Sequence, residues 1–328
     1  MVSTATEPMA YDGKRTESGN GVNDNVDILG IGYCGLDTLC LLPRIPLDDK
    51  VQISRTLVQG GGPAATATVA AARLGLDTAF LGVVGDDTRA EAVLQAFAKE
   101  GVDTQHVARR DGAESAAAFC WIDETTGKRS IAWSHGTAPA LAADEVPAGL
   151  VRSTRALHFD GHQTAAAIRS AEIAKEENIP VFLDAGTIVP DIEELLSLCT
   201  VVIASQAFAK RFTGIDDPEE ALRHLHGLGP QWTGITQGPA GSLGFDGERI
   251  VFEGQFPVEV VDTTGAGDVY HGGFASRYVQ SLKNGNAPDL RDCMRFATIT
   301  AGLKCRQLGG RTGIPSQDEV IQHLNENW

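Results

Sequence analysis

The stretch Asp262–Asp268, with the sequence DTTGAGD, has the residue types of an anion-binding loop with a carboxylate beside it. A helical pattern that starts at Val269 follows directly. Glycines at a helix start let several backbone N–H groups point at one anion, which also interacts with the positive end of the helix dipole. A carboxylate there would repel a resting phosphate, so Asp268 is better explained as a base that accepts a proton from an attacking hydroxyl. The alternative is an ordinary glycine turn in which Asp268 caps the helix.

A second glycine loop, Gly60–Gly62, lies about 200 residues earlier and precedes an alanine-rich helical pattern that ends at Gly75. Three consecutive glycines let the backbone approach a ligand closely, and Pro63 suits the first position of a helix. A hinge without ligand contact is the alternative, and one loop can serve both purposes.

The segment Gly30–Gly35 matches GxGxxG after a strand, which on paper is a dinucleotide-binding fingerprint. That fingerprint requires a helix to open at the loop. Pro43 and Pro46 fall where the helix should run, and proline inside a helix costs roughly 3 kcal/mol. We therefore do not predict a nicotinamide-dependent dehydrogenase. The chain also has no GxxxxGK[ST] sequence, which argues against a P-loop enzyme.

The composition is that of a globular protein. With 27 Lys and Arg against 43 Asp and Glu among 328 residues, the net charge of −16 disfavours nucleic acid or an anionic membrane as a partner. No apolar run approaches the roughly 20 residues of a membrane span. The six cysteines form no CxxC pair, which predicts buried thiols in a protein of a reducing, cytoplasmic compartment. Residues 1–25 are polar, and we expect a mobile tail.

From residue 26 onward, apolar strand patterns alternate with helical ones, which predicts an α/β fold with a doubly wound, mainly parallel sheet covered by helices on both faces. The predicted strands are Val26–Gly32, Phe80–Val84, Ala156–Phe159, Val181–Leu183, Val201–Ala204 and Gly234–Thr236, with a hairpin at Ser242–Phe245 and Arg249–Phe252. The predicted helices are Pro63–Leu74, Arg89–Lys99, Ala165–Glu177, Ile192–Leu198, Ala207–Thr213, Glu219–Leu228, Val269–Leu282, Leu290–Cys305 and Gln317–Leu324.

Two segments, at about 36–60 and 116–135, interrupt this alternation. The first contains the strand-like Val51–Val58, and the second reads as a hairpin around the turn at Glu124–Gly127. Together they predict a small β layer over the carboxyl ends of the core strands, where open α/β sheets bind ligands. Such a layer would act as a discontinuous lid on one domain that spans 26–328. Its strand edges could also pair with a second copy, so we expect a homodimer.

In order, Gly60–Gly62, Gly75, Leu81–Asp86, Thr236–Gly238 and DTTGAGD resemble the PfkB (ribokinase-like) family of sugar and nucleoside kinases. The resemblance covers about residues 26–326. Within the family, GGGPAATA, VVDTTGAGDVYHG and GGRTGIP look closest to sulfofructose kinases, whereas LHFDGH and AGLKC also resemble ketohexokinases. The resemblance implies a ribokinase-like fold and ATP-dependent phosphorylation of a sugar hydroxyl.

The resemblance also implies roles for individual residues. Asp268 matches the catalytic base, and Gly265, Ala266 and Gly267 match the anion hole for the transferred phosphoryl group. The positions that match sugar-binding residues are Asp37, Asp49, Gly61 and Gly62. For Asp37, an ordinary turn carboxylate is the alternative.

The positions that match the nucleotide site are Thr236, Gly238, Thr264, Gly265, Gly267 and Lys304. Arg311 lies with Lys304 in the region that closes over the nucleotide, although either could be a surface charge. Asp184 lies where a metal- or phosphate-side group often sits, and its alternative is a strand-end cap. The family's NxxE motif, which organises Mg²⁺, is replaced here by Ser205–Phe208. ATP and Mg²⁺ are still implied, and a monovalent cation stays open.

The acceptor is not fixed by these motifs. A sulfonated sugar would need Lys128, Arg129 or His162 as a polar partner, although a Lys-Arg pair after a glycine turn is more often a solvated hairpin end. His135 and His271 could lie near the site or be structural. A nucleoside kinase, with Trp121 or Trp133 lining a base slot, is one alternative. A non-catalytic sugar- or nucleotide-sensing module, suggested by the missing NxxE, is another.

Overall fold

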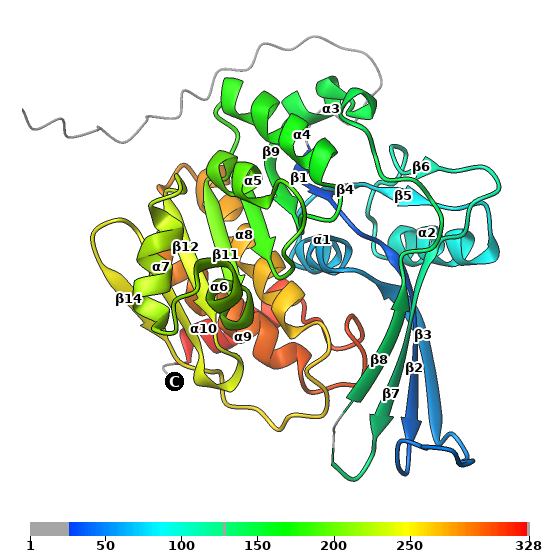
Figure 1. The fold of residues 1–328 in the computed structure, drawn as a ribbon. Coiled ribbons are helices and arrows are strands. Elements are labelled where there is room, and N and C mark those ends of the chain that lie inside the picture. The colour runs from blue at the N-terminus through cyan, green and yellow to red at the C-terminus, as the bar shows by residue number, and fades with distance from the viewer. Residues whose placement is uncertain (1–25, 127–128, 327–328) are drawn as a thin grey trace, which may run out of the picture.

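A computed structural model describes residues 26–126 and 129–326, and these form a central sheet flanked by helices with a second, smaller sheet beside it (Figure 1). The eight-stranded central sheet of the described residues has the order β14-β13-β12-β11-β10-β9-β1-β4. Its strands are β1 (Val26–Ile31), β4 (Thr78–Leu81), β9 (Thr154–Phe159), β10 (Val181–Ala185), β11 (Val201–Ser205), β12 (Trp232–Thr236), β13 (Ser242–Phe245) and β14 (Ile250–Glu253). The strands from β12 to β4 are parallel, and β13 and β14 close the sheet as an antiparallel hairpin.

Helices cover both faces of this sheet, because its strands are apolar throughout and must be buried on both sides. One face packs against α3 (Ala148–Arg152), α4 (Thr164–Glu176), α5 (Ile192–Leu198), α6 (Gln206–Thr213) and α7 (Pro218–His226). The other packs against α1 (Pro63–Arg73), α8 (Ala266–Lys283) and α9 (Leu290–Lys304). The helix α10 (Gln317–Asn325) packs against α9, and α2 (Thr88–Lys99) packs against β2 (Gly35–Leu42) and β3 (Arg55–Gly61).

The predicted α/β architecture is confirmed, and the main differences from the predicted bounds concern three elements. The helix expected from Val269 begins three residues earlier, at Ala266, so the glycine motif itself forms the first turn of α8. The strand expected at Val51–Val58 is instead Arg55–Gly61, and the stretch at Phe80–Val84 is divided between β4 and the short β5 (Val83–Val84). The pairing of β5 with β6 (Ala108–Arg109) and the helix α3 were not predicted.

The two segments that interrupted the alternation form one four-stranded sheet, here called the small sheet, with the order β3-β2-β7-β8. Its strands are β2 (Gly35–Leu42), β3 (Arg55–Gly61), β7 (Ala116–Asp123) and β8 (Arg129–Ser134). It projects from the main body in Figure 1. The face that carries Leu39 and Cys120 packs against Leu308, in the loop after α9. On the opposite face, Phe119 and Trp121 are exposed.

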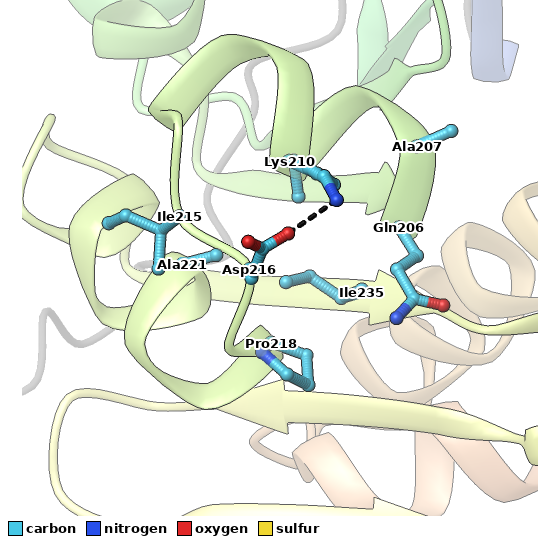
Figure 2. Close-up of a pocket in the computed structure, with 9 residues that line it drawn as sticks. Gln206, Ala207, Lys210, Ile215, Asp216, Pro218, Ala221 and Ile235 are labelled. Atoms are coloured by element: carbon cyan, nitrogen blue, oxygen red, sulfur yellow. Dashed lines mark ion pairs between the residues drawn. The ribbon is translucent and has the colours of Figure 1, made fainter.

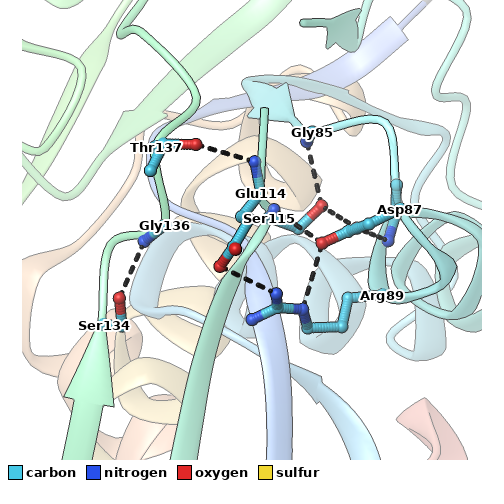
Figure 3. A network of polar contacts seen from close by, with 9 residues as sticks. Gly85, Asp87, Arg89, Glu114, Ser115, Ser134, Gly136 and Thr137 are labelled. Carbon is cyan, nitrogen blue, oxygen red and sulfur yellow. Dashed lines mark hydrogen bonds and ion pairs between the residues drawn. The ribbon is translucent and has the colours of Figure 1, made fainter. Parts of the chain in front are cut away.

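A polar network fixes the base of the small sheet to the N-terminus of α2 (Figure 3). Asp87 caps α2 through Ala90 N and accepts hydrogen bonds from the backbone and the hydroxyl of Ser115, at 2.9 and 2.7 Å. Arg89 then bridges Asp87 to Glu114. Burial disfavours the ionised carboxylate and by itself would raise the pKa of Asp87. The hydrogen bonds and Arg89 outweigh this effect and lower the pKa to about 2. The entry to β7 is therefore held by an ionised carboxylate.

All six cysteines lie in the described ranges and are free thiols. Across residues 26–126 and 129–326, every helix is too short or too polar to span a bilayer.

Candidate active site

The DTTGAGD motif connects a buried anchor to the start of α8. The side chain of Asp262 is only 8% exposed and accepts hydrogen bonds from Thr264 N (2.9 Å), Thr264 Oγ1 (2.7 Å) and Gly309 N (2.8 Å). Lys304 Nζ donates to the Asp262 carbonyl oxygen at 2.8 Å. These hydrogen bonds hold the loop before the helix in place without any ligand, which is the condition for a preorganised anion site.

Gly265 is the N-cap of α8 and has a φ of 74°, in the left-handed region that glycine adopts without cost. A Cβ at this position would lie 2.9 Å from both Cα and O of Gly310. The two glycines therefore allow the motif and the loop after α9 to touch. The first-turn N–H groups of a helix have no intrahelical acceptor. Ala266 N donates to Thr263 O at 3.2 Å, whereas the N–H groups of Gly267 and Asp268 are available to an anion.

Asp268 lies in this first turn and is partly buried. Its pKa is raised to about 6, because burial and the charge of Asp160 raise it more than Arg311 and Lys304 lower it. A carboxylate whose pKa lies near 6 is ionised at neutral pH and is a stronger base than an ordinary aspartate. This placement fits the predicted catalytic base.

Asp37, on β2, faces the same region. Its pKa is raised to about 6, because burial and the charge of Asp268 raise it more than Arg311 lowers it. The charge of Asp268 is among those that shift the pKa of Asp37, so these two predicted residues share one electrostatic environment. Gly61 lies against the Asp37 carboxylate, which would collide with any side chain there. Gly62 has a φ of 105° and caps the N-terminus of α1.

Asp160, at the end of β9, was not predicted as a site residue, although it is a centre of this region. Its carboxylate is 3% exposed and accepts backbone hydrogen bonds from Tyr33 (2.9 Å), Ala64 (3.1 Å) and His162 (3.0 Å). A side chain at Gly32 would collide with it. The GxGxxG segment thus serves packing rather than a dinucleotide, and a strand, β2, begins at Gly35 where a Rossmann helix would start. An acid directly after a buried strand was the available sequence signal.

Asp184, the weaker metal candidate, is the penultimate residue of β10, and its Oδ1 lies 3.3 Å from Nε2 of His271. Burial, together with the charges of Asp268 and Asp160, raises its pKa well above the usual range. Burial and neighbouring His158 lower the pKa of His271 well below its usual value. Asp184 therefore belongs to the same acidic cluster as Asp268.

Lys304 and Arg311 are not surface charges, and that alternative from the sequence is wrong. The exposed fraction of Lys304 is 0% and that of Arg311 is 5%. Lys304 lies beneath the motif, with its charge toward Asp262 and Asp268. Because Lys304 is buried, it would act on a nucleotide only through its positive charge and through the Asp262 loop that it holds in place.

Thr236 is the last residue of β12, and Gly238 lies two residues beyond it, at the edge where the parallel strands present their ligand-binding loops. Gly238 has a φ of 58° and open space beside its Cα. On the other side of the motif, Arg129 Nη1 of β8 donates to Thr263 Oγ1 at 2.9 Å. This contact joins the small sheet to the glycine motif.

One predicted sugar-binding residue, Asp49, is not brought into this cluster. Asp49 is exposed in the loop between β2 and β3, where it forms an ion pair with Arg44. That ion pair holds its pKa below the usual range. The loop is at the far tip of the small sheet in Figure 1. Lys128 lies outside the described residues.

An aromatic wall borders the Asp160 side of the site. The rings of Tyr33, His135 and His162 lie 5.5 to 5.8 Å apart, and Trp133 contacts His135 at 4.6 Å. Trp133 pairs with Ala118, and Ala118 pairs with Asp37 on the next strand. Trp133 therefore lies on the same face of the small sheet as Asp37, the predicted sugar-binding residue. Trp121 lies on the opposite face and cannot line the same slot.

A separate cavity of about 250 Å³ lies between α6 and α7 (Figure 2). Gln206 and Ile235 line it, and an ion pair between Lys210 and Asp216 crosses it. It contains none of the residues predicted for catalysis, sugar binding or nucleotide binding, and we assign the site to the edge around Asp268 instead.

Residues 28–317 match the family model described as pfkB family carbohydrate kinase. The chain is 26% identical over 310 residues to the bifunctional ribokinase/ribose-5-phosphate isomerase A of Fructilactobacillus sanfranciscensis, covering 92% of this chain and 56% of that protein. It is 25% identical over 316 residues to the nucleoside kinase of Methanothermobacter thermautotrophicus, covering 94% and 98%. The solved structure of Arabidopsis thaliana ribokinase with ribose and ATP has a TM-score of 0.79 at 23% identity, covering 91% and 98%.

Proposed function

Because the chain belongs to the pfkB family of carbohydrate kinases, which transfer a phosphoryl group to an alcohol, we propose that it phosphorylates a sugar hydroxyl with ATP and uses Asp268 as the general base. One observation carries the assignment of the residues. Asp268 occupies the first turn of α8, behind a glycine motif braced for an anion, and shares its electrostatic environment with Asp37.

In the proposed mechanism, Asp37 accepts a hydrogen bond from one acceptor hydroxyl and orients the sugar. Asp268 accepts the proton of the reacting hydroxyl as its oxygen attacks the γ-phosphoryl of ATP. The N–H groups of Gly265–Gly267 stabilise the charge that develops on the transferred group. Thr236 and Gly238 would contact the nucleotide at the end of β12. If the small sheet acts as a lid, its closure excludes water and limits hydrolysis of ATP.

Magnesium is part of this proposal, since it neutralises nucleotide phosphates in such reactions. Mg²⁺ is usually held by one or two carboxylates together with the phosphates. Asp184 fits that requirement because its carboxylate lies near the end of β10, within the electrostatic reach of Asp268, and a bound cation would favour its ionised form. The described residues hold no cluster of three metal-binding side chains, so most ligands would come from the nucleotide and water.

The test is magnesium-dependent ADP release with fructose, ribose, sulfofructose, phosphorylated hexoses and adenosine as acceptors. We expect saturable turnover of one sugar and its loss in Asp268→Asn. ATP binding without turnover of any acceptor would favour the sensing module instead.

The acceptor we favour is a ketose or a sulfonated ketose such as sulfofructose, with Arg129 or His162 near its far end. A nucleoside is the second candidate. Trp133 favours it, because this indole is 63% exposed on the face that carries Asp37 and offers a stacking surface for a base. Saturable turnover of adenosine but of no sugar would select the nucleoside.

A homodimer through the small sheet is also proposed. Its outer face exposes Val58, Phe119 and Trp121, at 54%, 52% and 37%. Exposed apolar patches of this kind are typical of protein interfaces. Light scattering would show twice the 34.7 kDa mass of the chain, and a monomer at micromolar concentration would contradict the proposal. The free thiols support a reducing, cytoplasmic location.

Activity is expected to fall as the solution becomes acidic. Asp268 accepts a proton only when ionised, and the pKa values of Asp268 and Asp37 are both about 6. We therefore expect kcat/KM to be constant above about pH 7 and to decrease at least tenfold per unit well below pH 6. Since the two carboxylates interact, the apparent pKa values belong to the pair. Initial rates between pH 5 and 8.5 measure this, and a profile that is flat down to pH 5 would contradict the assignment.

A further inference from the structure

Arg311 is a buried cation that the proposed mechanism does not use. It lies in the loop after α9, and its guanidinium reaches Gly61 O (3.4 Å) and Thr66 Oγ1 (3.3 Å) and lies over the ring of Phe97 at 5.2 Å. Its backbone N–H donates to Gln59 Oε1 at 3.4 Å. Nη1 is buried and has no hydrogen-bond partner among the described residues. Such a group is costly to bury, so its retention needs a reason beyond packing.

The position of Arg311 relative to Asp37 supplies that reason. A Cβ on Gly60 would collide with Nη1 of Arg311, whereas a Cβ on Gly61 would collide with the carboxylate of Asp37. Successive residues of a strand project to opposite faces, and both glycines belong to β3. The guanidinium and the carboxylate therefore lie on opposite sides of the strand, separated by backbone alone. We call Gly60 and Gly61 the glycine partition.

The partition brings the charges close without joining them in an ion pair. The acidic or thiol groups that face the guanidinium are Asp37, Cys34, Glu100 and Asp268. Arg311 in turn lowers the pKa of both Asp37 and Asp268 against the effect of burial. Its own pKa, lowered to about 10, leaves it a cation at neutral pH. Asp37 thus experiences the positive field while its oxygens stay available to a hydroxyl.

We propose that Arg311 is a positioning residue of the phosphoryl-transfer site, which holds the Gly60–Gly62 loop and keeps Asp37 and Asp268 ionised through the glycine partition. The inference rests on the proposed function for its kinetic consequence. Its electrostatic part concerns the resting protein and can be tested without a substrate.

The experiment titrates the carboxyl groups of Asp37 and Asp268 by NMR of ¹³C-labelled aspartate, assigned with Asp37→Asn and Asp268→Asn. In Arg311→Met, both carboxyl groups should titrate about one pH unit higher than in the wild type, because a nearby opposite charge has been removed. Arg311→Lys should keep most of the wild-type values. Unchanged titration of Asp37 in Arg311→Met would overturn the proposal, whatever acceptor the enzyme uses.

Arg73→Met is the matched structural control. Arg73 Nη1 holds the same loop through Arg311 O (2.7 Å) and Ile314 O (3.1 Å), but Arg73 is not among the charges that shift Asp37 or Asp268. It should lower thermal stability and leave both titrations in place. An equal shift in Arg73→Met would mean that Arg311 acts only through the fold.

Gly60→Ala tests the partition without removing the charge. Its methyl group must displace the guanidinium from behind Asp37, so the titration of Asp37 should move upward as in Arg311→Met. Once the acceptor is known, the acid limb of kcat/KM should move with the titrations in both variants. A wild-type titration in Gly60→Ala would overturn the role of the partition.

Discussion

Replacing Asp268 with asparagine is expected to lower kcat about a thousandfold, within the range that a positioned general base contributes. Asparagine has nearly the same shape and can still accept a hydrogen bond, but it cannot take the proton of the acceptor hydroxyl. The KM for ATP should change little, because the N–H groups of the motif remain in place. Steady-state ADP release at pH 8, with saturating acceptor, measures the effect.

The matched control is Asp292→Asn. Asp292 lies in the first turn of α9, as Asp268 lies in the first turn of α8, and it pairs with Arg277 at 2.6 Å. A general loss of charge at a helix start would affect both variants, whereas loss of a base affects only one. If Asp268→Asn kept more than a tenth of the wild-type kcat, the general-base assignment would be wrong.

Gly265→Ala is expected to lower kcat at least about a hundredfold, comparable to the loss of a donor from an oxyanion site. The left-handed φ of 74° would cost an L-residue about 1 kcal/mol. The larger problem is the backbone of Gly310, 2.9 Å from the added methyl group. Neither backbone can yield without moving the N–H groups that hold the transferred phosphoryl.

Gly285→Ala separates these two effects. Gly285 follows the other end of α8 with the same φ of 74°, and a Cβ added there would have no atom within 4 Å. It should cost a similar amount of backbone strain and leave kcat unchanged. Equal kcat in Gly265→Ala and in the wild type would show that the anion hole does not depend on this glycine. Thermal denaturation of both variants checks that they are folded.

The parts of this site that the sequence predicts are those encoded by local patterns. The DTTGAGD stretch signals a helix start by its glycines, and apolar runs followed by polar residues mark strand ends such as that at Thr236. For Asp37, the family resemblance was needed in addition, because a single aspartate in a strand has no distinctive neighbours. The structure then placed Asp37 beside Asp268.

What the sequence did not predict depends on tertiary packing. Asp160 is organised by backbone N–H groups from three separate segments, around Tyr33, Ala64 and His162, and no local pattern joins them. Arg311 follows two glycines and resembles a charge on an exposed turn. Only the folded chain shows that it passes behind β3, so its burial could not be anticipated.

The acidic cluster also affects folding. Protonated Asp37 and Asp268 are favoured in the native state, since their pKa values of about 6 lie above the unfolded value. The stability they contribute is present below about pH 4 and is lost as pH rises through 6. Asp87, with a pKa of about 2, has the opposite effect on folding stability. Its stabilising contribution is present above about pH 4 and is lost as pH falls through 2. For these three groups, the native state is most stable near pH 4, where the base is protonated. At neutral pH, Asp37 and Asp268 are therefore ionised at a cost in folding stability, and this cost keeps the catalytic base ready to accept a proton.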